Sequence, residues 1–323
     1  MIDIKSLLQE NKTVAYLNFG TVKYKIGTLL YANRSVYFEF SQDFLNHYLP
    51  ISPLHLKPIA GIQEFSNPDH FNLPGVFYDA LPDGWGLLLQ DRYLRKTGIS
   101  IAEISPIHRL LLRENRSVGA LEFIPEYKFN ESESFKPIDL LFSESENVLT
   151  GKSSDVIPLL LQLNGSSTGA RPKAMMKYDS QKNEWYYGNT TNDAEVEDWL
   201  VKFPTKQDGL DAGAIEFVYA EMAKNAGLII PETKLIESGH HQGYFAVKRF
   251  DHIKNRRFHT HSISGLLHHN FRIPSLDYEQ IFQVVWSLTQ SISELEQLFL
   301  QLVFNVVFHN RDDHGKNLLK MWE

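Results

Sequence analysis

The chain has no cysteine among its 323 residues. This absence excludes a disulfide framework and any zinc site held by cysteine, and it makes a reducing cytoplasm the expected location. No apolar run approaches the roughly 20 residues that a membrane-spanning helix needs. The first six residues carry charges and lack the apolar stretch of a secretory signal. We therefore expect no membrane association.

Positive charge is also in short supply. The chain has 32 Lys and Arg against 39 Asp and Glu, which gives a formal net charge of -7. A protein that grips a phosphate backbone needs an excess of basic side chains on one face, so direct nucleic-acid binding is not expected. Hydrophobic residues make up 43% of the chain, which allows a large core, and the length suggests about two domains.

The first part of the chain has the pattern of a small antiparallel sheet. Short alternating runs between residues 13 and 40 are separated by glycines and a turn. The turn at Leu81–Gly86 leads into a segment with helical spacing, 87–94. We assign residues 1–125 to a β-rich N-terminal domain. The Ser-, Glu- and Lys-rich segment 126–155 is the expected connection, and residues 156–323 form the second domain.

The second part combines strands and helices in the order of a bilobal kinase, so the expected fold class is α+β. Its predicted elements are a hairpin at 173–187, a strand at 199–204, a helix at 214–225, a strand at 244–250 and a buried helix at 294–308. This last helix leads into a polar loop, 309–317.

The polar loop is the strongest chemical signal in the sequence. In kinase-type phosphoryl transfer an aspartate orients the substrate hydroxyl, and an asparagine about five positions later binds Mg²⁺. Asp312 and Asn317 have this spacing. A solvated turn after a helix is the simpler explanation, because Asp and Asn commonly cap backbone groups there. A metal hydrolase built from His309, Asp312, Asp313 and His314 is a further alternative.

Two features upstream also have a structural and a functional interpretation. A loop of small residues ends at Lys173, where backbone N–H groups could approach phosphate oxygens, although a plain hairpin turn would have the same composition. Lys202 lies inside an apolar strand. It either points its ammonium group to the edge of a sheet or reaches phosphates while paired with an acid such as Glu216.

Five segments in order along the chain resemble the HipA family of bacterial toxin kinases. They are VFYDALPDGWG (76–86), TGARPK (168–173), VKRFD (247–251), the run 261–278 containing GLLH and PSLDY, and HNRDDHGKN (309–317). The last segment is also similar to the catalytic loop of phosphatidylinositol kinases. The resemblance implies a serine/threonine protein kinase, the toxin of a toxin–antitoxin system, with ATP and Mg²⁺ as cofactors. It also implies a HipB-like helix-turn-helix antitoxin as a partner.

The resemblance further implies roles for individual residues. Asp312 would be the catalytic base and Asn317 a magnesium ligand, and Ser166 would be an autophosphorylation site, with Ser167 and Thr168 as neighbouring alternatives. The residues expected to bind ATP fall into four groups: Thr168, Gly169, Ala170, Arg171, Pro172 and Lys173 as a phosphate loop; Lys202; Lys248, Arg249 and Phe250 as an adenine hinge; and His314, Gly315 and Lys316 beside the catalytic loop.

The ending departs from the family pattern. Family members continue into a segment whose aspartate holds Mg²⁺, whereas only residues 318–323 follow the polar loop here. We expect an incomplete C-lobe and a site without its second metal ligand. Three readings remain open: a HipA-type kinase, a catalytically impaired module that binds nucleotide and an antitoxin-like partner, and a small-molecule or lipid kinase on the same scaffold.

Overall fold

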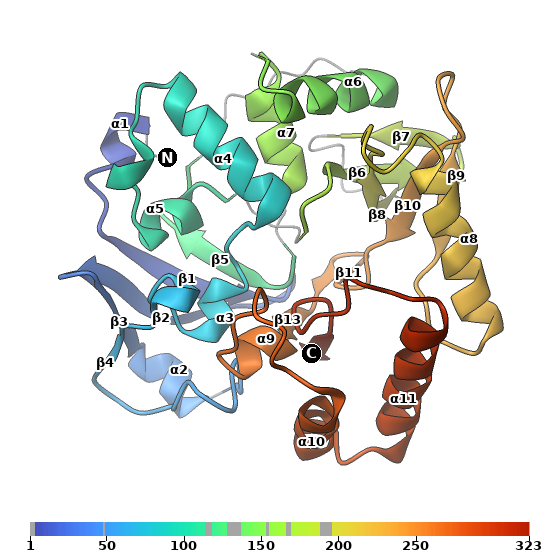
Figure 1. The fold of residues 1–323 in the computed structure, drawn as a ribbon. Coiled ribbons are helices and arrows are strands. Elements are labelled where there is room, and N and C mark those ends of the chain that lie inside the picture. Colours follow the sequence, from blue (N-terminus) through green and yellow to red (C-terminus); the bar gives the residue numbers. More distant parts are fainter. Residues whose placement is uncertain are drawn as a thin grey trace.

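The computed structural model describes residues 4–47, 49–113, 118–127, 137–152, 155–165, 169–187 and 196–322. It shows an α+β fold built on two five-stranded antiparallel sheets (Figure 1). The first sheet lies at the lower left of Figure 1 and the second at the right, with α9 and β13 between them. Among the described residues, no helix is long and apolar enough to cross a membrane.

The first sheet has the strand order β4-β3-β2-β1-β5. The predicted strands between residues 13 and 40 are confirmed as β1, β2 and β3, and the helix expected after the turn is confirmed as α4. The elements of this part are α1 (Ile4–Leu7), β1 (Lys12–Asn18), β2 (Lys23–Ala32), β3 (Ser35–Phe40), α2 (Gln42–Asn46), β4 (Ile62–Phe65), η1 (Pro68–His70), α3 (Gly75–Tyr78), α4 (Gly84–Lys96), η2 (Ile101–Glu103), α5 (Pro106–Leu111) and β5 (Leu121–Ile124).

The second sheet has the order β7-β6-β8-β10-β9, so β8 is its central strand. The predicted hairpin is β6 and β7. The segment expected to connect the domains contains a helix, α6. The elements are α6 (Ile138–Leu149), α7 (Ile157–Asn164), β6 (Lys173–Asp179), β7 (Glu184–Tyr186), β8 (Val196–Lys202), α8 (Ala212–Asn225), β9 (Thr233–Ile236), β10 (Tyr244–Lys248), β11 (His252–Ile253), β12 (Arg256–Arg257), β13 (His259–Ser262), α9 (Ile263–Leu266), α10 (Tyr278–Thr289), α11 (Ile292–Val307) and β14 (Leu319–Trp322).

One apolar core joins the two sheets. Buried side chains continue from Leu17 and Phe38 in the first sheet, through Trp85 on α4, to Trp199 and Val201 on β8. A second cluster of buried residues lies under α9, α10 and α11. Because the larger core crosses from one sheet to the other, the first domain is fixed against the second. Any site between the two sheets therefore has rigid walls on both sides.

The helix at the end of the chain differs from the sequence prediction. A helix is present, α11, but among its residues only Leu298 is buried. Phe299, Val306 and Val307 are 57%, 65% and 61% exposed, so the expectation of a buried helix was wrong. Periodic apolar residues predict which side of a helix is apolar, but not whether another element covers that side. Ile215 on α8 is exposed in the same way.

The turn at the start of α4 touches the second domain closely enough to require glycine. Gly84 has a φ of +39°, and an added Cβ would lie 2.6 Å from both the Ala170 Cα and the Gly169 carbonyl oxygen. Main-chain atoms of the two segments would then have to separate. The Trp85 N–H donates a hydrogen bond to the same Gly169 carbonyl oxygen at 3.1 Å.

We predict that Gly84→Ala destabilises the protein more than Gly98→Ala. Both positions have positive φ, which costs an alanine about 1–2 kcal/mol. Only Gly84 meets other backbone atoms, since an added Cβ at Gly98 has nothing within 4 Å, so Gly84→Ala should lose about 1–3 kcal/mol more through overpacking. Urea unfolding of the two variants measures the difference. Equal losses of unfolding free energy in the two variants would show that the close approach of Gly84 to residues 169 and 170 does not limit stability.

Candidate functional site

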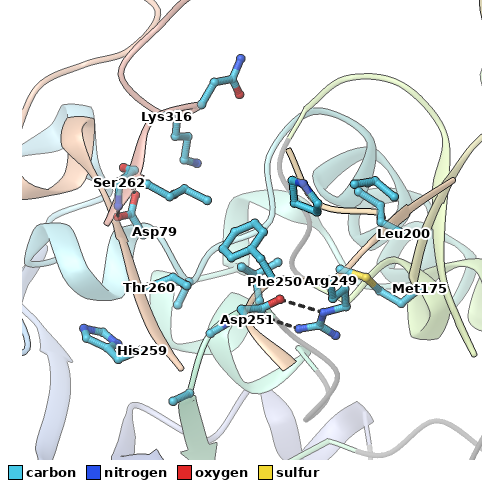
Figure 2. A pocket seen from close by; sticks show the side chains of 18 of the residues that line it. Asp79, Met175, Leu200, Arg249, Phe250, Asp251, His259, Thr260, Ser262 and Lys316 are labelled. Atoms are coloured by element: carbon cyan, nitrogen blue, oxygen red, sulfur yellow. Dashed lines mark hydrogen bonds and ion pairs between the residues drawn. The ribbon is translucent and has the colours of Figure 1, made fainter. Parts of the chain in front are cut away.

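A cavity of about 540 Å³ lies between the second sheet and the N-terminal domain (Figure 2). Met175 and Leu200 line it at one end, and Lys316 and Asp79 line it at the other. The first end is apolar and the second is charged. A cavity of this size with a few polar groups at one end suits a small ligand that carries a flat apolar part and a charged part.

The predicted adenine hinge lies beside the apolar end. Lys248, Arg249 and Phe250 all line the cavity. The Lys248 ammonium group pairs with Glu197 and, at 3.5 Å, with Glu232. The N–H groups of Lys248 and Arg249 donate hydrogen bonds to main-chain oxygens within the second domain, so these two donors are already used. The segment therefore contributes a wall to the cavity, and its two N–H groups are not open to a ligand.

A buried ion pair joins this wall to the N-terminal domain. The Arg249 guanidinium group donates to both carboxylate oxygens of Asp251, at 3.0 and 2.6 Å, and both side chains are buried. Burial by itself would raise the pKa of Asp251, but the charge and hydrogen bonds of Arg249 outweigh it and lower that pKa to about 2. The Gly119 N–H also donates to Asp251, at 2.7 Å. This carboxylate thus ties the loop before β5 to the second domain.

Lys202 is confirmed as a cavity residue paired with an acid. It lies at the end of β8, the central strand, and its ammonium group forms an ion pair with Glu216 on α8. Lys202 also lines the cavity. The alternative placement at a sheet edge is excluded, because β8 has β6 on one side and β10 on the other. The pair fixes the distance between the central strand and α8.

The structure brings Asp312 and Asn317 together in the polar loop. The Asn317 Nδ2 donates to the Asp312 carbonyl oxygen at 2.6 Å, which closes the loop. Asn317 lines the cavity, whereas the Asp312 side chain lies outside the cavity lining and is 84% exposed. The Asp312 carboxylate also lies 3.4 Å from the Nε2 of His314. The loop therefore places one side chain on the cavity wall and directs an open carboxylate to solvent.

His314 and Gly315 support this loop and do not line the cavity. The His314 ring packs against Phe271, with 5.1 Å between ring centroids. The Gly315 carbonyl oxygen accepts a hydrogen bond from the Ser264 N–H at 3.0 Å. A Cβ on Gly315 would lie 2.8 Å from Leu276. Both residues were expected to line a nucleotide site, but the contacts here fix the loop on α9 and the segment that follows it.

The predicted phosphate loop is only partly described. Ser166 and Thr168 lie outside the described residues. Gly169 to Lys173 are described and do not line the cavity. Arg171 forms an ion pair with Asp208, and burial, followed by the charge of Lys202, lowers the pKa of Lys173 to about 8. The segment lies outside the cavity lining, and its buried Lys173 is opposite Lys202 where β6 pairs with β8.

Asp83 is the site residue that the sequence reasoning missed. Its carboxylate accepts hydrogen bonds from the Gly169 N–H at 2.6 Å and from the Lys316 ammonium group at 3.0 Å. Lys316 is only 2% exposed and lies between the rings of Tyr78 and Phe271. Asp83 lies in the segment 76–86 that resembles the HipA family, but no role was assigned to it beyond a turn before a helix. No local signal indicated that this turn reaches two loops of the other domain.

The metal hydrolase alternative finds no support in the described part of the chain. No group of three or more His, Cys, Asp or Glu side chains there could hold a metal ion. The Asp313 carboxylate accepts a hydrogen bond from the Tyr278 hydroxyl at 2.7 Å, so it points away from Asp312. Mg²⁺ is usually bound through one or two protein oxygens plus substrate phosphates. Asn317 can supply such an oxygen, and Lys202 and Lys316, which also line the cavity, have the charge to bind phosphates.

We predict a pH-dependent loss of stability from His259, whose buried ring lines the cavity. Its Nε2–H donates to the Ile51 carbonyl oxygen at 2.8 Å, and burial lowers its pKa from 6.5 to about 4. Between pH 6.5 and about 4, His259 is therefore protonated in the unfolded chain but neutral in the folded chain. Stability from this group is complete above pH 6.5 and falls by about 1.4 kcal/mol per unit as the pH drops toward 4.

His259→Gln keeps a donor for Ile51 and removes the titration, so the free energy of unfolding should fall less steeply between pH 6.5 and 4. Thr260→Val changes a buried, non-titrating neighbour and should keep the wild-type slope. Urea unfolding across this pH range measures both. Parallel curves for His259→Gln and the wild type would contradict the assignment.

The comparisons with known proteins cover most of the chain. Residues 165–322 match the model of the HipA-like C-terminal domain, and residues 20–124 match that of the HipA N-terminal domain. No curated protein matches the chain. A solved complex of HipA, HipB and operator DNA from Shewanella oneidensis MR-1 is similar in fold, with a TM-score of 0.60 and 18% identity over 95% of this chain and 72% of that one. The chain belongs to the HipA family.

Proposed function

We propose that this chain is a serine/threonine protein kinase that transfers the γ-phosphate of ATP to a protein hydroxyl, and that it acts as the toxin of a toxin–antitoxin system. One observation carries the proposal. Lys202, which is paired with Glu216, lines the same cavity as Asn317, and Asn317 is hydrogen-bonded to Asp312. Kinase-type phosphoryl transfer uses this set of groups for positioning and charge stabilisation.

Each group has a role that follows from its position. The apolar end of the cavity, with Met175 and Leu200, receives the adenine ring. Lys202 reaches the phosphates from the central strand, and Asn317 offers an oxygen to Mg²⁺. Bound Mg²⁺ would supply charge neutralisation on the phosphoryl oxygens. Asp312 accepts the proton of the attacking hydroxyl, because its exposed carboxylate can reach a substrate from outside.

The exposure of Asp312 favours a protein acceptor over a small molecule. A small hydroxyl substrate needs an enclosing pocket that buries most of its surface. The Asp312 side chain is 84% exposed, so the acceptor side of the site is open. A loop of another protein can present its hydroxyl at such a surface. This openness is the reason that we rank a lipid or small-molecule kinase behind a protein kinase.

The proposed partner follows from the family. The Shewanella complex contains HipA together with HipB and its operator DNA. We propose a HipB-like helix-turn-helix antitoxin as the partner of this chain. The net charge of -7 supports a division of labour in which the partner, and not this chain, supplies most of the contacts to phosphates.

We predict that Asp312→Asn abolishes phosphate transfer while nucleotide binding persists. The amide cannot take up the hydroxyl proton, and general base catalysis typically contributes about 10²- to 10⁴-fold in rate. Asp313→Asn is the matched control, because it changes the neighbouring acid, which binds Tyr278, and it should lose less than about tenfold. Transfer of label from [γ-³²P]ATP to the protein or to an added acceptor protein measures both variants.

Equal losses in the two variants, or no loss in Asp312→Asn, would reject Asp312 as the base. A wild-type protein that binds ATP tightly but transfers no label to protein, lipid or sugar acceptors would instead favour the impaired interaction module. Label on lipid or sugar alone would favour the small-molecule kinase.

Ser166 stays a prediction, since it lies outside the described residues. If the loop is regulated as in the family, incubation with ATP should place phosphate on Ser166, which lies two positions before the predicted phosphate loop. Mass spectrometry of the wild type, of Ser166→Ala and of the control Ser167→Ala identifies the position. Phosphate that persists in Ser166→Ala at the wild-type level would place the modification elsewhere.

A further inference from the structure

We propose that Asp83, a residue of the N-terminal domain, is a positioning residue for the phosphate end of the nucleotide site. Its carboxylate holds Gly169 and Lys316 at fixed positions, so the N-terminal domain sets the geometry in which phosphates are bound. The proposal rests on the proposed function, since it concerns how the same cavity binds ATP. It adds Asp83 and the N-terminal domain, to which the proposed function assigns no role.

The hydrogen bonds of Asp83 join three segments that are far apart in the sequence. The Asp83 Oδ1 accepts from the Gly169 N–H at 2.6 Å, and Oδ2 accepts from the Lys316 ammonium group at 3.0 Å. Gly169 begins the described part of the predicted phosphate loop. Lys316 directly precedes Asn317. One carboxylate thus fixes the distance between the two loops expected to act on the phosphates.

Burial makes these contacts costly to break. Asp83 is 6% exposed and Lys316 is 2% exposed. A buried ion pair is a weak source of net stability, but the loss of one partner is costly because it leaves the other charge without compensation. The Lys316 ammonium group also lies 4.8 Å from the centre of the Tyr78 ring and 5.0 Å from that of Phe271. Its direction is therefore fixed from several sides.

The charges around Asp83 lead to the same conclusion. Lys202 and Lys316 line the cavity, and the buried Lys173 lies close enough to Lys202 for that charge to lower its pKa. The charge of Asp83 acts in the opposite direction on the same lysine. Neighbouring positive side chains repel one another, and an anion among them offsets this repulsion. Asp83 is an anion that is present before any phosphate binds.

The support of Asp83 is itself rigid. It is the residue before α4, and the next two residues are packed on Gly169 and Ala170. The Trp85 N–H donates to the Gly169 carbonyl oxygen at 3.1 Å, and the Trp85 side chain is buried in the common core. Asp83 and Trp85 therefore bind the N–H and the carbonyl group of the same glycine. This arrangement transmits the position of the N-terminal domain to the loop.

A carboxylate near phosphates could instead oppose binding by repulsion. Here both oxygens of Asp83 accept hydrogen bonds, one of them from a full positive charge, so much of its field is compensated locally. Loss of the carboxylate would remove this repulsion but would also release Lys316. Less repulsion would tighten phosphate binding, whereas the release of Lys316 would weaken it. We expect the release of Lys316 to dominate.

The test compares Asp83→Asn with a control on the same helix, Asp91→Asn. The asparagine keeps an oxygen for Gly169 but turns an amide N–H toward the Lys316 ammonium group. Asp91 forms an ion pair with Arg109 at 2.9 Å, and neither residue lines the cavity. Calorimetric titrations with adenosine and with a non-hydrolysable ATP analogue separate the base end of the site from the phosphate end.

In Asp83→Asn we expect the dissociation constant for the ATP analogue to rise at least about tenfold, as for other broken buried charge pairs. Adenosine affinity should change by less than about twofold, because the base end is independent of the pair. Asp91→Asn should keep the wild-type ratio of the two affinities. Tighter analogue binding in Asp83→Asn, an unchanged ratio, or an equal loss for both ligands would overturn the proposal.

If the wild type binds neither ligand, the nucleotide-binding function is rejected, but the positioning role of Asp83 is not. Hydrogen exchange of the ligand-free protein then tests that role. Amides of residues 169–173 and 311–319 should exchange faster in Asp83→Asn than in the wild type and in Asp91→Asn. Amides of β1 to β3 should exchange at unchanged rates. Equal exchange of the two loops in all three proteins would overturn the positioning role of Asp83.

Discussion

The structure depends on two carboxylates, the buried Asp83 and the largely buried Asp79, which hold the N-terminal domain against the loops of the second domain. Asp79 accepts hydrogen bonds from the His261 Nδ1–H at 2.6 Å and from the N–H and hydroxyl of Ser262, both at 2.7 Å. Burial would raise the pKa of Asp79, but its bonds and the charges of His261 and Lys316 lower it. Asp79 thus remains an anion inside the protein.

These two anions fix the C-terminal end of the polar loop 309–317. Asp79 holds β13, which pairs with β14 directly after the loop, and Asp83 holds Lys316 within it. His261 also joins Asp79 to Ser52, because its Nδ1 bonds Asp79 and its Nε2 lies 3.0 Å from the Ser52 hydroxyl. Ser52 and His261 are both completely buried, so the contact between these two side chains is a structural connection between the domains, whereas Asp79 lines the cavity. The cavity has its shape because the two domains cannot move apart there without unpairing buried charges.

The apolar surfaces of α8 and α11 lie outside this connection. Tyr219 on α8 meets Phe308 after α11, with 5.7 Å between ring centroids, and the Gln297 side-chain oxygen accepts from the Ile229 N–H. Several large apolar side chains of both helices are nevertheless exposed, among them Val218 and Phe299. Periodicity predicted both helices correctly. The degree to which each is covered depends on elements that a helix pattern does not describe.

The sequence by itself determined the local elements and the chemical type of the main groups. Alternation and spacing identified strands of both sheets, the helices α4, α8 and α11, and the polar loop with Asp312 and Asn317, because these depend on residues that are near one another or on the period of one element. Only the tertiary structure decided that Asp83 reaches Gly169 and Lys316, that Lys316 is buried and that α11 is exposed. These properties depend on contacts between segments up to 233 positions apart, which carry no local sequence pattern.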